Sequence, residues 1–435
     1  MYLHKITIQN IRSIKHFELE FEPKKYAGWH VVIGDNGSGK STIISAIALA
    51  LIGTNEAPAL RQNWGNWLRY RESKGQIQLE IVPDIKFDQT IGKEAIFNQS
   101  HLHAHLAFKK VPSLRGQQIV LEAPEIEGIN PKIDLWGNGE GWFSASYGPF
   151  RRFYGGNRDY ERLFQSNPKL APHLSAFGED VALTECLNWL QNLHIKQLEG
   201  QNDGQLLNRL KTFLNEGGLL PHNTVLQQVT SEAVVFVDGN GCEVAVEQLS
   251  DGYRSILSMI FELIRLLVRA YGTTNVFRAL CQNRMEIDLP GVVLIDEIDA
   301  HLHPTWQRQV GFWLRRYFPN IQFIVTTHSP LVCQAAEQGT VWRLPVPGTD
   351  FEGGRVDGKE FQRLVHGNIL EALDTDLFGM DVARSASSQQ KLQHLAVLNY
   401  KALHSPLSLE EETERQQLRA MLPTAVNETT NGKPN

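Results

Sequence analysis

The chain has 435 residues, of which 42% are hydrophobic and 21% are charged. This mixture is typical of a folded protein rather than of a disordered or fibrous one, and the length suits one large domain with insertions. The formal net charge of −6 excludes an overall basic field, so any contact with nucleic acid must come from a local patch. The sequence has neither the ~20 continuous apolar residues of a membrane span nor the apolar run of a signal peptide. We therefore expect a cytoplasmic protein without a membrane partner.

The four cysteines, Cys186, Cys242, Cys281 and Cys333, lie far apart in the sequence. They form no CxxC pair that would suggest a zinc ribbon or a redox motif. We therefore expect reduced, buried thiols.

Residues 1–157 predict the first lobe of an α/β fold. Alternating polar and apolar residues from 5 to 23 predict two strands, and an apolar strand at 29–33 leads into a glycine-rich turn. Small apolar residues from 41 to 51 predict a helix that packs under a sheet. Further strands are predicted in the segments QIQLEIV, HLHAHLAF, QQIVLEA and GWFSASY. We expect these four to form an antiparallel β lobe.

The rest of the chain predicts three further parts. Leucine-rich helical spacing indicates a helical insert over residues 158–232. Strands and helices alternate over residues 233–345, which is typical of a parallel sheet between helices. Residues 346–435 predict a helical extension, with a capping box from Ser408 to Glu411 and a polar, disordered end. No heptad pattern of a long coiled coil is present in the sequence.

A phosphate-binding loop is predicted directly after the strand at 29–33. The segment GDNGSGKST fits the pattern G-x-x-x-x-G-K-[ST] between an apolar strand and a helix. Its glycines let main-chain amides face the β- and γ-phosphates of ATP, and the start of the helix adds a favourable dipole. Lys40 would balance phosphate charge, and the Ser41 hydroxyl would bind Mg²⁺. The predicted ATP-binding residues are Gly34, Asp35, Asn36, Gly37, Ser38, Gly39, Lys40, Ser41 and Thr42.

Two acidic residues end a second apolar strand, in the segment GVVLIDE at 291–297. A buried strand has no ordinary structural use for two carboxylates at its end, and the pattern is typical of a Walker B element. Asp296 would hold Mg²⁺, and Glu297 would polarise the water that attacks the γ-phosphate. The following residues, IDAHLHP, make the pattern more specific and place Asp299 in a D-loop.

The segment LSDGYR precedes a long amphipathic helix and is similar to the signature motif of ABC proteins. Ser250, Asp251 and Gly252 would form an anion site at the helix start that meets the γ-phosphate held by another subunit. The alternative is a well-capped helix, because serine is a good N-cap and aspartate suits the first turn. The order of the three motifs along the chain favours the signature.

His328 follows a third apolar strand, in the segment QFIVTTHSP. An imidazole at this position can contact the γ-phosphate and sense hydrolysis, as a switch histidine does. A lone histidine is more often structural, but its place after the strand that follows the Walker B element favours the functional role.

Two other groups have less specific patterns. His101, His103 and His105 share one face of a predicted strand, but no nearby cysteine or carboxylate completes a metal site, so we favour a solvent-facing strand. The segment FRRFY at 150–154, together with Arg158, predicts either a basic, aromatic surface for nucleic acid or a segment that joins two domains.

Together, these motifs resemble the ABC-class ATPases grouped with RecF and the OLD proteins, and most closely the ATPase subunits of Septu and retron-linked anti-phage systems. The resemblance covers residues 1–345. It implies an α/β fold: an ABC-type P-loop head with a mixed or parallel core sheet, an antiparallel β lobe, a helical insert and a helical C-terminal extension. It also implies an ATPase that uses ATP and Mg²⁺ and forms a homodimer or higher oligomer. Arg12, in NIRSI, matches an arginine that approaches the nucleotide in such proteins.

The chain departs from the wider family in two respects. The signature reads LSDGY rather than the LSGGQ of transporters, which counts against a membrane-coupled ATPase. No TOPRIM-like acidic constellation follows His328, so we expect no nuclease within the chain. The Q-loop glutamine is not placed, and Gln62 is only a candidate for it.

The leading functional hypothesis is an ATPase subunit whose ATP-dependent dimerisation controls a separately encoded effector, a nuclease, in anti-phage defence. One alternative is a RecF-like DNA-repair ATPase that clamps DNA, and another is an ATP-bound regulatory scaffold with slow turnover. DNA or another nucleic acid stays open as a partner.

Overall fold

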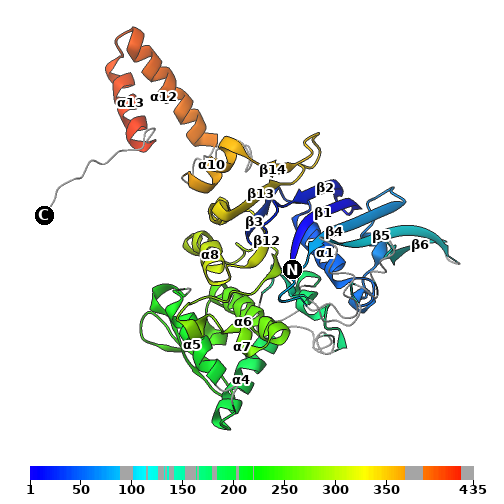
Figure 1. The fold of residues 1–435 in the computed structure, drawn as a ribbon. Helices are drawn as coiled ribbons and strands as arrows, with labels where there is room; N and C mark the ends of the chain where they lie inside the picture. Colours follow the sequence, from blue (N-terminus) through cyan, green and yellow to red (C-terminus); the bar gives the residue numbers. More distant parts are fainter. Residues whose placement is uncertain are drawn as a thin grey trace. The chain divides into compact units, whose positions relative to one another are not determined.

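The fold is taken from a computed structural model of the chain, drawn in Figure 1. The described residues are 1–88, 101–113, 116–125, 132, 135–136, 142–151, 163, 166–178, 184–201, 205–218, 220–367 and 386–422. The chain divides into two compact units, Met1–Ile369 and Leu370–Asn435.

An antiparallel sheet forms the first lobe of the larger unit. Its strand order is β2-β1-β4-β5-β6, and buried residues alternate with more exposed ones along β4 and most of β5. Such alternation is expected when one face of a sheet packs on the core and the other faces solvent. The strands are β1 (Tyr2–Ile11), β2 (Ile14–Glu20), β4 (Lys74–Val82), β5 (Leu102–Ser113) and β6 (Gly116–Glu122).

A mixed six-stranded sheet forms the core, with the order β14-β13-β3-β12-β11-β7. The five strands from β13 to β7 are parallel, and β14 is antiparallel to β13. Figure 1 shows β13, β3 and β12 side by side. The strands are β3 (Gly28–Ile33), β7 (Ser144–Tyr147), β11 (Gly291–Ile295), β12 (Ile321–Thr327), β13 (Gly339–Arg343) and β14 (Gly354–Val356).

Helix α1 (Lys40–Ile52) lies between the two sheets, because it contacts β1, β4 and β5 of the first sheet and β7, β11 and β12 of the second. Every residue of α1 except Ser41 is buried. A helix that is apolar on all sides is expected where both sides are covered. The segment predicted as a helix under a sheet is therefore confirmed, with a second sheet on its other side.

Helices α8 and α6 pack beside the core sheet, where α8 contacts β3 and α6 contacts β7. Helix α8 approaches β3 closely at Gly311, where an added Cβ would lie 2.5 Å from Ala335 and 2.9 Å from Trp29. The segment beyond Gly217 also carries a small sheet, so residues 158–232 are not helical throughout. The helices are α4 (Thr184–Leu198), α5 (Gln205–Glu216), α6 (Asp251–Tyr271), α7 (Thr273–Val276), α8 (Pro304–Tyr317) and α9 (Pro330–Cys333), and the small sheet has β8 (Val225–Val229), β9 (Val234–Val237) and β10 (Glu243–Ala245).

One strand prediction was wrong. The segment GWFSASY was assigned to the antiparallel lobe, but its strand, β7, pairs in parallel with β11 at the edge of the core sheet. The partner strand β11 lies about 150 positions after β7 in the chain, and Val292 pairs with Ser144. Local spacing carries no signal for such a partner, which is why the sequence pattern placed β7 with its neighbours in sequence.

The C-terminal part is not helical throughout. Strand β14 and helix α10 (Gly358–His366) belong to the larger unit, where a glycine-containing turn lets β14 fold back on β13. The smaller unit holds α12 (Ala386–His404) and α13 (Leu409–Met421), which share the buried residues Leu395, Leu398 and Leu418. The predicted capping box of Ser408 and Glu411 is confirmed at the start of α13. The predicted disordered end, residues 426–435, lies outside the described residues.

Two further predictions meet the structure here. Among the described helices, none combines the length and the apolar character that crossing a membrane requires. All four cysteines are free, but Cys242 and Cys281 are exposed, so the prediction of buried thiols was wrong for these two. Cys242 ends a turn between β9 and β10, and Cys281 lies in a single turn of 3-10 helix, where surface positions are usual.

Candidate active site

The predicted site residues gather at one edge of the core sheet. Strands β7, β11, β12 and β3 are neighbours and run parallel, so their carboxyl ends lie along the same edge. The phosphate loop follows β3, His328 follows β12, and Asp296 and Glu297 follow β11. This edge is where α/β sheets place ligands.

The phosphate loop connects β3 to α1. Gly37 and Gly39 have φ values of 81° and 108°, a region that side chains disfavour, and a Cβ at Gly39 would lie 2.7 Å from Ser13 Oγ. The Lys40 ammonium donates to the main-chain oxygens of Gly34 (2.7 Å) and Asp35 (3.0 Å). The tip of the loop, residues 35–37, is exposed, so its main chain is open to a ligand.

Lys40 stands in a group of carboxylates. Burial lowers its pKa, and the carboxylates of Glu297 and Asp296, followed by Asp35 and Asp299, act in the opposite direction. The structure therefore brings the lysine of the phosphate loop close to the acidic end of β11. Ser38 Oγ is buried and has no hydrogen-bond partner among the described residues, so one polar group of the loop is left for a ligand or water.

Arg12 lies in the tight turn between β1 and β2, next to the phosphate loop. The turn spans Ile11 to Ile14, and its Ser13 is the residue that approaches Gly39. The guanidinium carbon of Arg12 lies 4.3 Å from the ring centroid of Trp67, and burial lowers its pKa. Arg12 also has a φ of 47°, which is unfavourable for a side chain of this size. The structure thus places Arg12 beside the site, held by an aromatic ring.

The acidic end of β11 is held by Thr326 of the neighbouring strand. Thr326 Oγ1 donates to Asp296 Oδ1 (2.5 Å) and accepts from the main-chain N–H of Glu297 (2.8 Å). Asp296 is only 4% exposed. Glu297 has a φ of 45°, a sparsely populated backbone conformation that costs about 1–3 kcal/mol and persists only where the surrounding structure holds it.

The last residues of β12 connect His328, the predicted switch histidine, to Asp299 of the predicted D-loop. Thr327 Oγ1 donates to Asp299 Oδ1 (2.5 Å) and accepts from the main-chain N–H of Ser329 (2.9 Å). His328 lies between these two anchored positions, and its side chain is exposed. An exposed imidazole on a fixed main chain can reach a bound ligand without a loop rearrangement.

The predicted signature residues begin helix α6. Ser250 is the N-cap residue and is exposed, but its side chain makes no capping hydrogen bond. Asp251 pairs with Arg254, and a Cβ at Gly252 would lie 2.8 Å from the main-chain oxygen of His301. The helix start is therefore packed on the segment after β11, while the Ser250 hydroxyl stays available.

Sequence reasoning missed the role of Arg151 and assigned it to a basic surface or a domain connection. The structure places it after β7, where it is 3% exposed and donates to main-chain oxygens behind the acidic end of β11. Burial lowers its pKa to about 10, so it remains charged at neutral pH. The segment FRRFY held no local signal for burial, and its residues 152–154 lie outside the described residues.

The residues present fit ATP with Mg²⁺. Hydroxyl and carboxylate oxygens are the ligands that Mg²⁺ prefers, and Ser41 is the one exposed residue of α1, directly after Lys40. The Asp296 carboxylate stands close enough to Lys40 to influence its pKa. Ser41 and Asp296 would therefore hold the metal, which would neutralise phosphate charge when it is bound.

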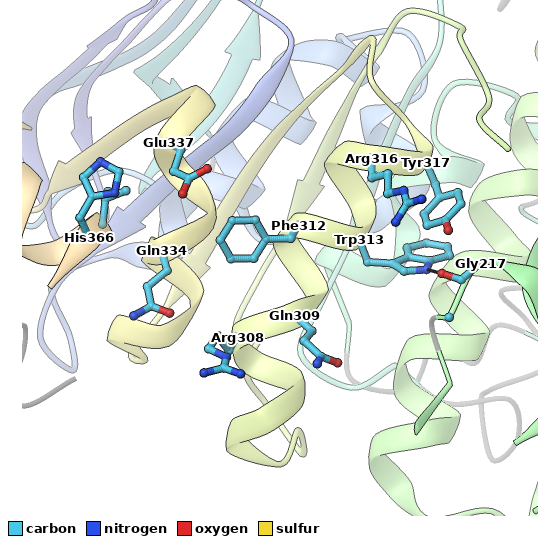
Figure 2. Close-up of a pocket in the computed structure, with 12 residues that line it drawn as sticks. Gly217, Arg308, Gln309, Phe312, Trp313, Arg316, Tyr317, Gln334, Glu337 and His366 are labelled. Atoms are coloured by element: carbon cyan, nitrogen blue, oxygen red, sulfur yellow. Dashed lines mark hydrogen bonds between the residues drawn. The ribbon is translucent and has the colours of Figure 1, made fainter. Parts of the chain in front are cut away.

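A cavity of about 640 Å³ lies elsewhere, on the outer face of α8 (Figure 2). Its lining includes Gly217, Arg308, Phe312, Trp313, Gln334 and His366. Trp313 Nε1 donates to the main-chain oxygen of Gly217 at its edge. None of the predicted nucleotide residues lines this cavity, so it is not the ATP site.

Two family models match the chain. The model described as "AAA domain, putative AbiEii toxin, Type IV TA system" matches residues 156–334, and the model described as "AAA domain" matches residues 5–105. The "Retron Ec83 probable ATPase" of Escherichia coli is 26% identical, with 78% of this chain and 70% of the relative covered. The "Septu protein PtuA" of Bacillus mycoides (strain KBAB4) is 25% identical, with 78% of this chain covered. The chain spans 40% of the length of that relative.

Among solved structures, an SMC head bound to the C-winged helix domain of ScpA aligns with 82% of this chain and 97% of its own, at 14% identity and a TM-score of 0.45. The two AAA-domain models together reach both the phosphate loop and the acidic end of β11. The chain is thus an ATPase with two segments that match AAA-domain models, and it is similar to the ATPases of retron and Septu systems.

Proposed function

We propose that two copies of the chain close on two ATP molecules, and that this ATP-dependent dimerisation controls a separately encoded effector, a nuclease, in anti-phage defence. The observation that carries the dimer is the exposed Ser250 at the start of α6. Its hydroxyl is not used as a cap, and a helix start favours an anion. A γ-phosphate held by a second copy has the charge that this position would accept.

Within each site, the roles follow from chemistry. Lys40 and the amides of the phosphate loop bind the phosphates, and Arg12 adds a positive charge beside them. Glu297 accepts a proton from the attacking water, and His328 contacts the γ-phosphate. Mg²⁺, held by Ser41 and Asp296, neutralises phosphate charge, and Asp299 keeps the D-loop in place through Thr327.

The effector role is supported by the relatives, which are named as parts of retron and Septu systems. Among the described residues, no group of three or more His, Cys, Asp or Glu side chains is arranged to hold a metal ion. We propose that the effector is a separate protein, as the names of the relatives suggest.

The dimer is tested with Ser250→Arg. A bulky cation at the helix start should block closure, because the serine touches only the nucleotide of the other copy, while ATP binding to the isolated chain should stay normal. Light scattering with and without ATP measures the dimer, and calorimetry measures ATP affinity. Gln248→Arg, also at an exposed position, is the matched control for added charge. A Ser250→Arg protein that dimerises with ATP like the wild type rules out the two-site arrangement.

A mixture of Ser250→Arg and Lys40→Ala chains sharpens this test. One site of the mixed dimer then has both its phosphate loop and its signature intact, and the other site carries both defects. We expect partial recovery of ATPase activity where a single intact site can act. The control of an effector is tested in cells that carry the whole gene cluster: Lys40→Ala should abolish protection against phage, and full protection would rule out control by ATP.

A further inference from the structure

Arg151 connects two parts of one chain. One is the segment after β11 that contains Asp296 and Glu297, called the catalytic loop below, and the other is helix α6, which the predicted signature begins. Its Nε donates to Ser255 Oγ (3.0 Å), and Ser255 lies on the second turn of α6. Its Nη1 donates to the main-chain oxygen of Asp296 (2.9 Å), and its Nη2 donates to that of Glu297 (3.0 Å). Both Arg151 and Ser255 are buried, at 3% and 1% exposure.

Such a buried guanidinium is strongly fixed. Arginine presents its donors in a rigid plane, and each buried oxygen or nitrogen that loses its partner costs about 1–3 kcal/mol. Arg151 Nη1 also donates to the main-chain oxygen of Gly148 (2.9 Å), so the guanidinium is tied to the strand from which it comes. These hydrogen bonds therefore hold β7, α6 and the end of β11 in a fixed position relative to one another.

Two other contacts tie the same parts together. Gly252 lies against the main chain of His301, as described above, and the ring of Tyr253 lies 5.0 Å from that of Trp306, between centroids. Both contacts join the first turn of α6 to the segment that follows Glu297. A displacement of the helix start is thus transmitted to the catalytic loop and is not absorbed by a flexible connection.

Glu297 is the residue in this loop that is sensitive to such a displacement. Its φ of 45° persists only while hydrogen bonds hold the main chain, and Arg151 supplies one of them. A small change at this position moves the carboxylate relative to the water that it must activate. Misplacement by about 1 Å can lower a rate about a hundredfold.

We propose that Arg151 is a positioning residue that couples the two ATP sites of the dimer. Ser250 contacts the nucleotide of the other copy, and Ser255 and Arg151 carry the position of the same helix to Glu297 of the chain's own site. ATP bound in one site therefore fixes the position of Glu297, the catalytic carboxylate, in the other site. This inference rests on the proposed dimer.

The test uses the full-length chain with Ser255→Ala, which removes one acceptor of Arg151 and leaves every ATP-contacting residue in place. We expect unchanged ATP affinity, unchanged ATP-dependent dimerisation and a kcat about tenfold lower, as the loss of one hydrogen bond to a charged group implies. We expect a Hill coefficient for ATP above 1 in the wild type and a fall to 1 in Ser255→Ala. Arg151→Lys keeps the charge but not the planar donor set, and should have the same or a larger effect.

Ser258→Ala is the matched control. Ser258 is buried on the same helix and its hydroxyl donates to the main-chain oxygen of Ser255 (3.1 Å), and it is not among the hydrogen-bond partners of Arg151 in the described part of the chain. It should lower Tm to a similar extent as Ser255→Ala, yet keep the kcat and the Hill coefficient of the wild type. A purely structural role of Ser255 would lower Tm only.

The possible results distinguish the coupling through Arg151 from the proposed ATP-dependent dimer. A Ser255→Ala protein with the kcat and Hill coefficient of the wild type overturns the coupling while the proposed dimer stands. The coupling is also overturned when Ser258→Ala loses cooperativity equally, or when the wild type dimerises but has a Hill coefficient of 1. A wild type that does not dimerise with ATP shows instead that the proposed function is wrong, and the coupling then fails with it.

Discussion

The two large sheets use polar residues in different ways. In the core sheet, every residue of β3, β11 and β12 is buried, and the polar side chains that could act on a ligand follow the ends of the strands. In the antiparallel sheet, polar residues alternate along the strands, as His103 and His105 do between the buried residues of β5. The first arrangement concentrates chemistry at one edge, and the second spreads it over a face.

Strand direction explains the difference. In a parallel sheet all carboxyl ends meet at one edge, so loops that lie far apart in sequence converge there. In an antiparallel sheet, neighbouring strands end at opposite edges, and cross-strand pairs such as Glu80 with His103 are the usual contacts. We therefore expect substitutions at the ends of the core strands to change activity, and equivalent substitutions on the antiparallel face to leave it unchanged.

The largest effect is expected for Lys40→Ala. It removes the ammonium that donates hydrogen bonds to main-chain oxygens of the phosphate loop, so ATP affinity should fall about a hundredfold or more. Isothermal calorimetry measures the affinity. Lys5→Ala, on β1 of the antiparallel sheet, is the matched control because Lys5 pairs only with surface carboxylates, Glu18 and Glu20, among the described residues. Equal ATP affinity in Lys40→Ala and Lys5→Ala would contradict the assignment of the loop.

Glu297→Gln should keep ATP affinity and lower kcat by about a hundredfold or more, because the amide has nearly the same shape but cannot accept the proton. The closed dimer should then accumulate with ATP, which light scattering detects. Glu80→Gln makes the same chemical change on the antiparallel sheet and should leave kcat unaltered. Wild-type turnover by Glu297→Gln would show that another group activates the water.

The motifs at the core edge were predictable because each one is local. A buried strand, a turn and a helix start follow one another within a short segment around Lys40, and the same holds for the segments that contain Asp296 and His328. The fold class and the ATPase activity followed from these segments. Burial of both faces of β11 and β12 was also visible, since continuous apolar runs are typical of central parallel strands.

The parts that depend on distant contacts were not predictable in the same way. Arg151 contacts Ser255 and Asp296 across 104 and 145 positions, and its own segment has the composition of a surface. The parallel partner of β7 is equally distant in sequence. The unfavourable φ of Glu297 also has no sequence signal, because only the surrounding hydrogen bonds select it.

A smaller effect is expected for a buried histidine of the core sheet. His30 lies on β3 between the main-chain oxygen of Tyr26 (2.8 Å) and Thr340 Oγ1 (2.9 Å), and burial, followed by the charge of Arg355, lowers its pKa to about 4. The folded protein thus favours the neutral imidazole, while the unfolded chain takes up a proton as the pH falls below 6.5. The free energy of unfolding should therefore be unaffected by His30 above pH 6.5 and should fall by about 3 kcal/mol as the pH falls to 4.

Denaturation in urea between pH 7 and pH 4 tests this prediction with His30→Gln. The variant cannot titrate at this position, so its free energy of unfolding should fall less over the same pH range than that of the wild type. The difference between the two profiles isolates His30 from the other titrating groups. Parallel profiles would contradict the assignment of a neutral, buried imidazole.

The smallest effect is expected on the antiparallel face, where His103→Gln replaces one of the three histidines that the sequence aligned on one face. His103 is partly exposed and stands opposite Glu80, and no metal-binding group of three ligands is present among the described residues. The free energy of unfolding should change by less than about 0.5 kcal/mol, as for most surface substitutions, and the ATPase rate should stay the same. Zn²⁺ should not raise the Tm of the wild type, because among the described residues these histidines and Glu80 are not arranged as a metal-binding group. A rise in Tm with Zn²⁺ that His103→Gln abolishes would place a metal site on the antiparallel sheet, and the contrast between the two sheets would then fail.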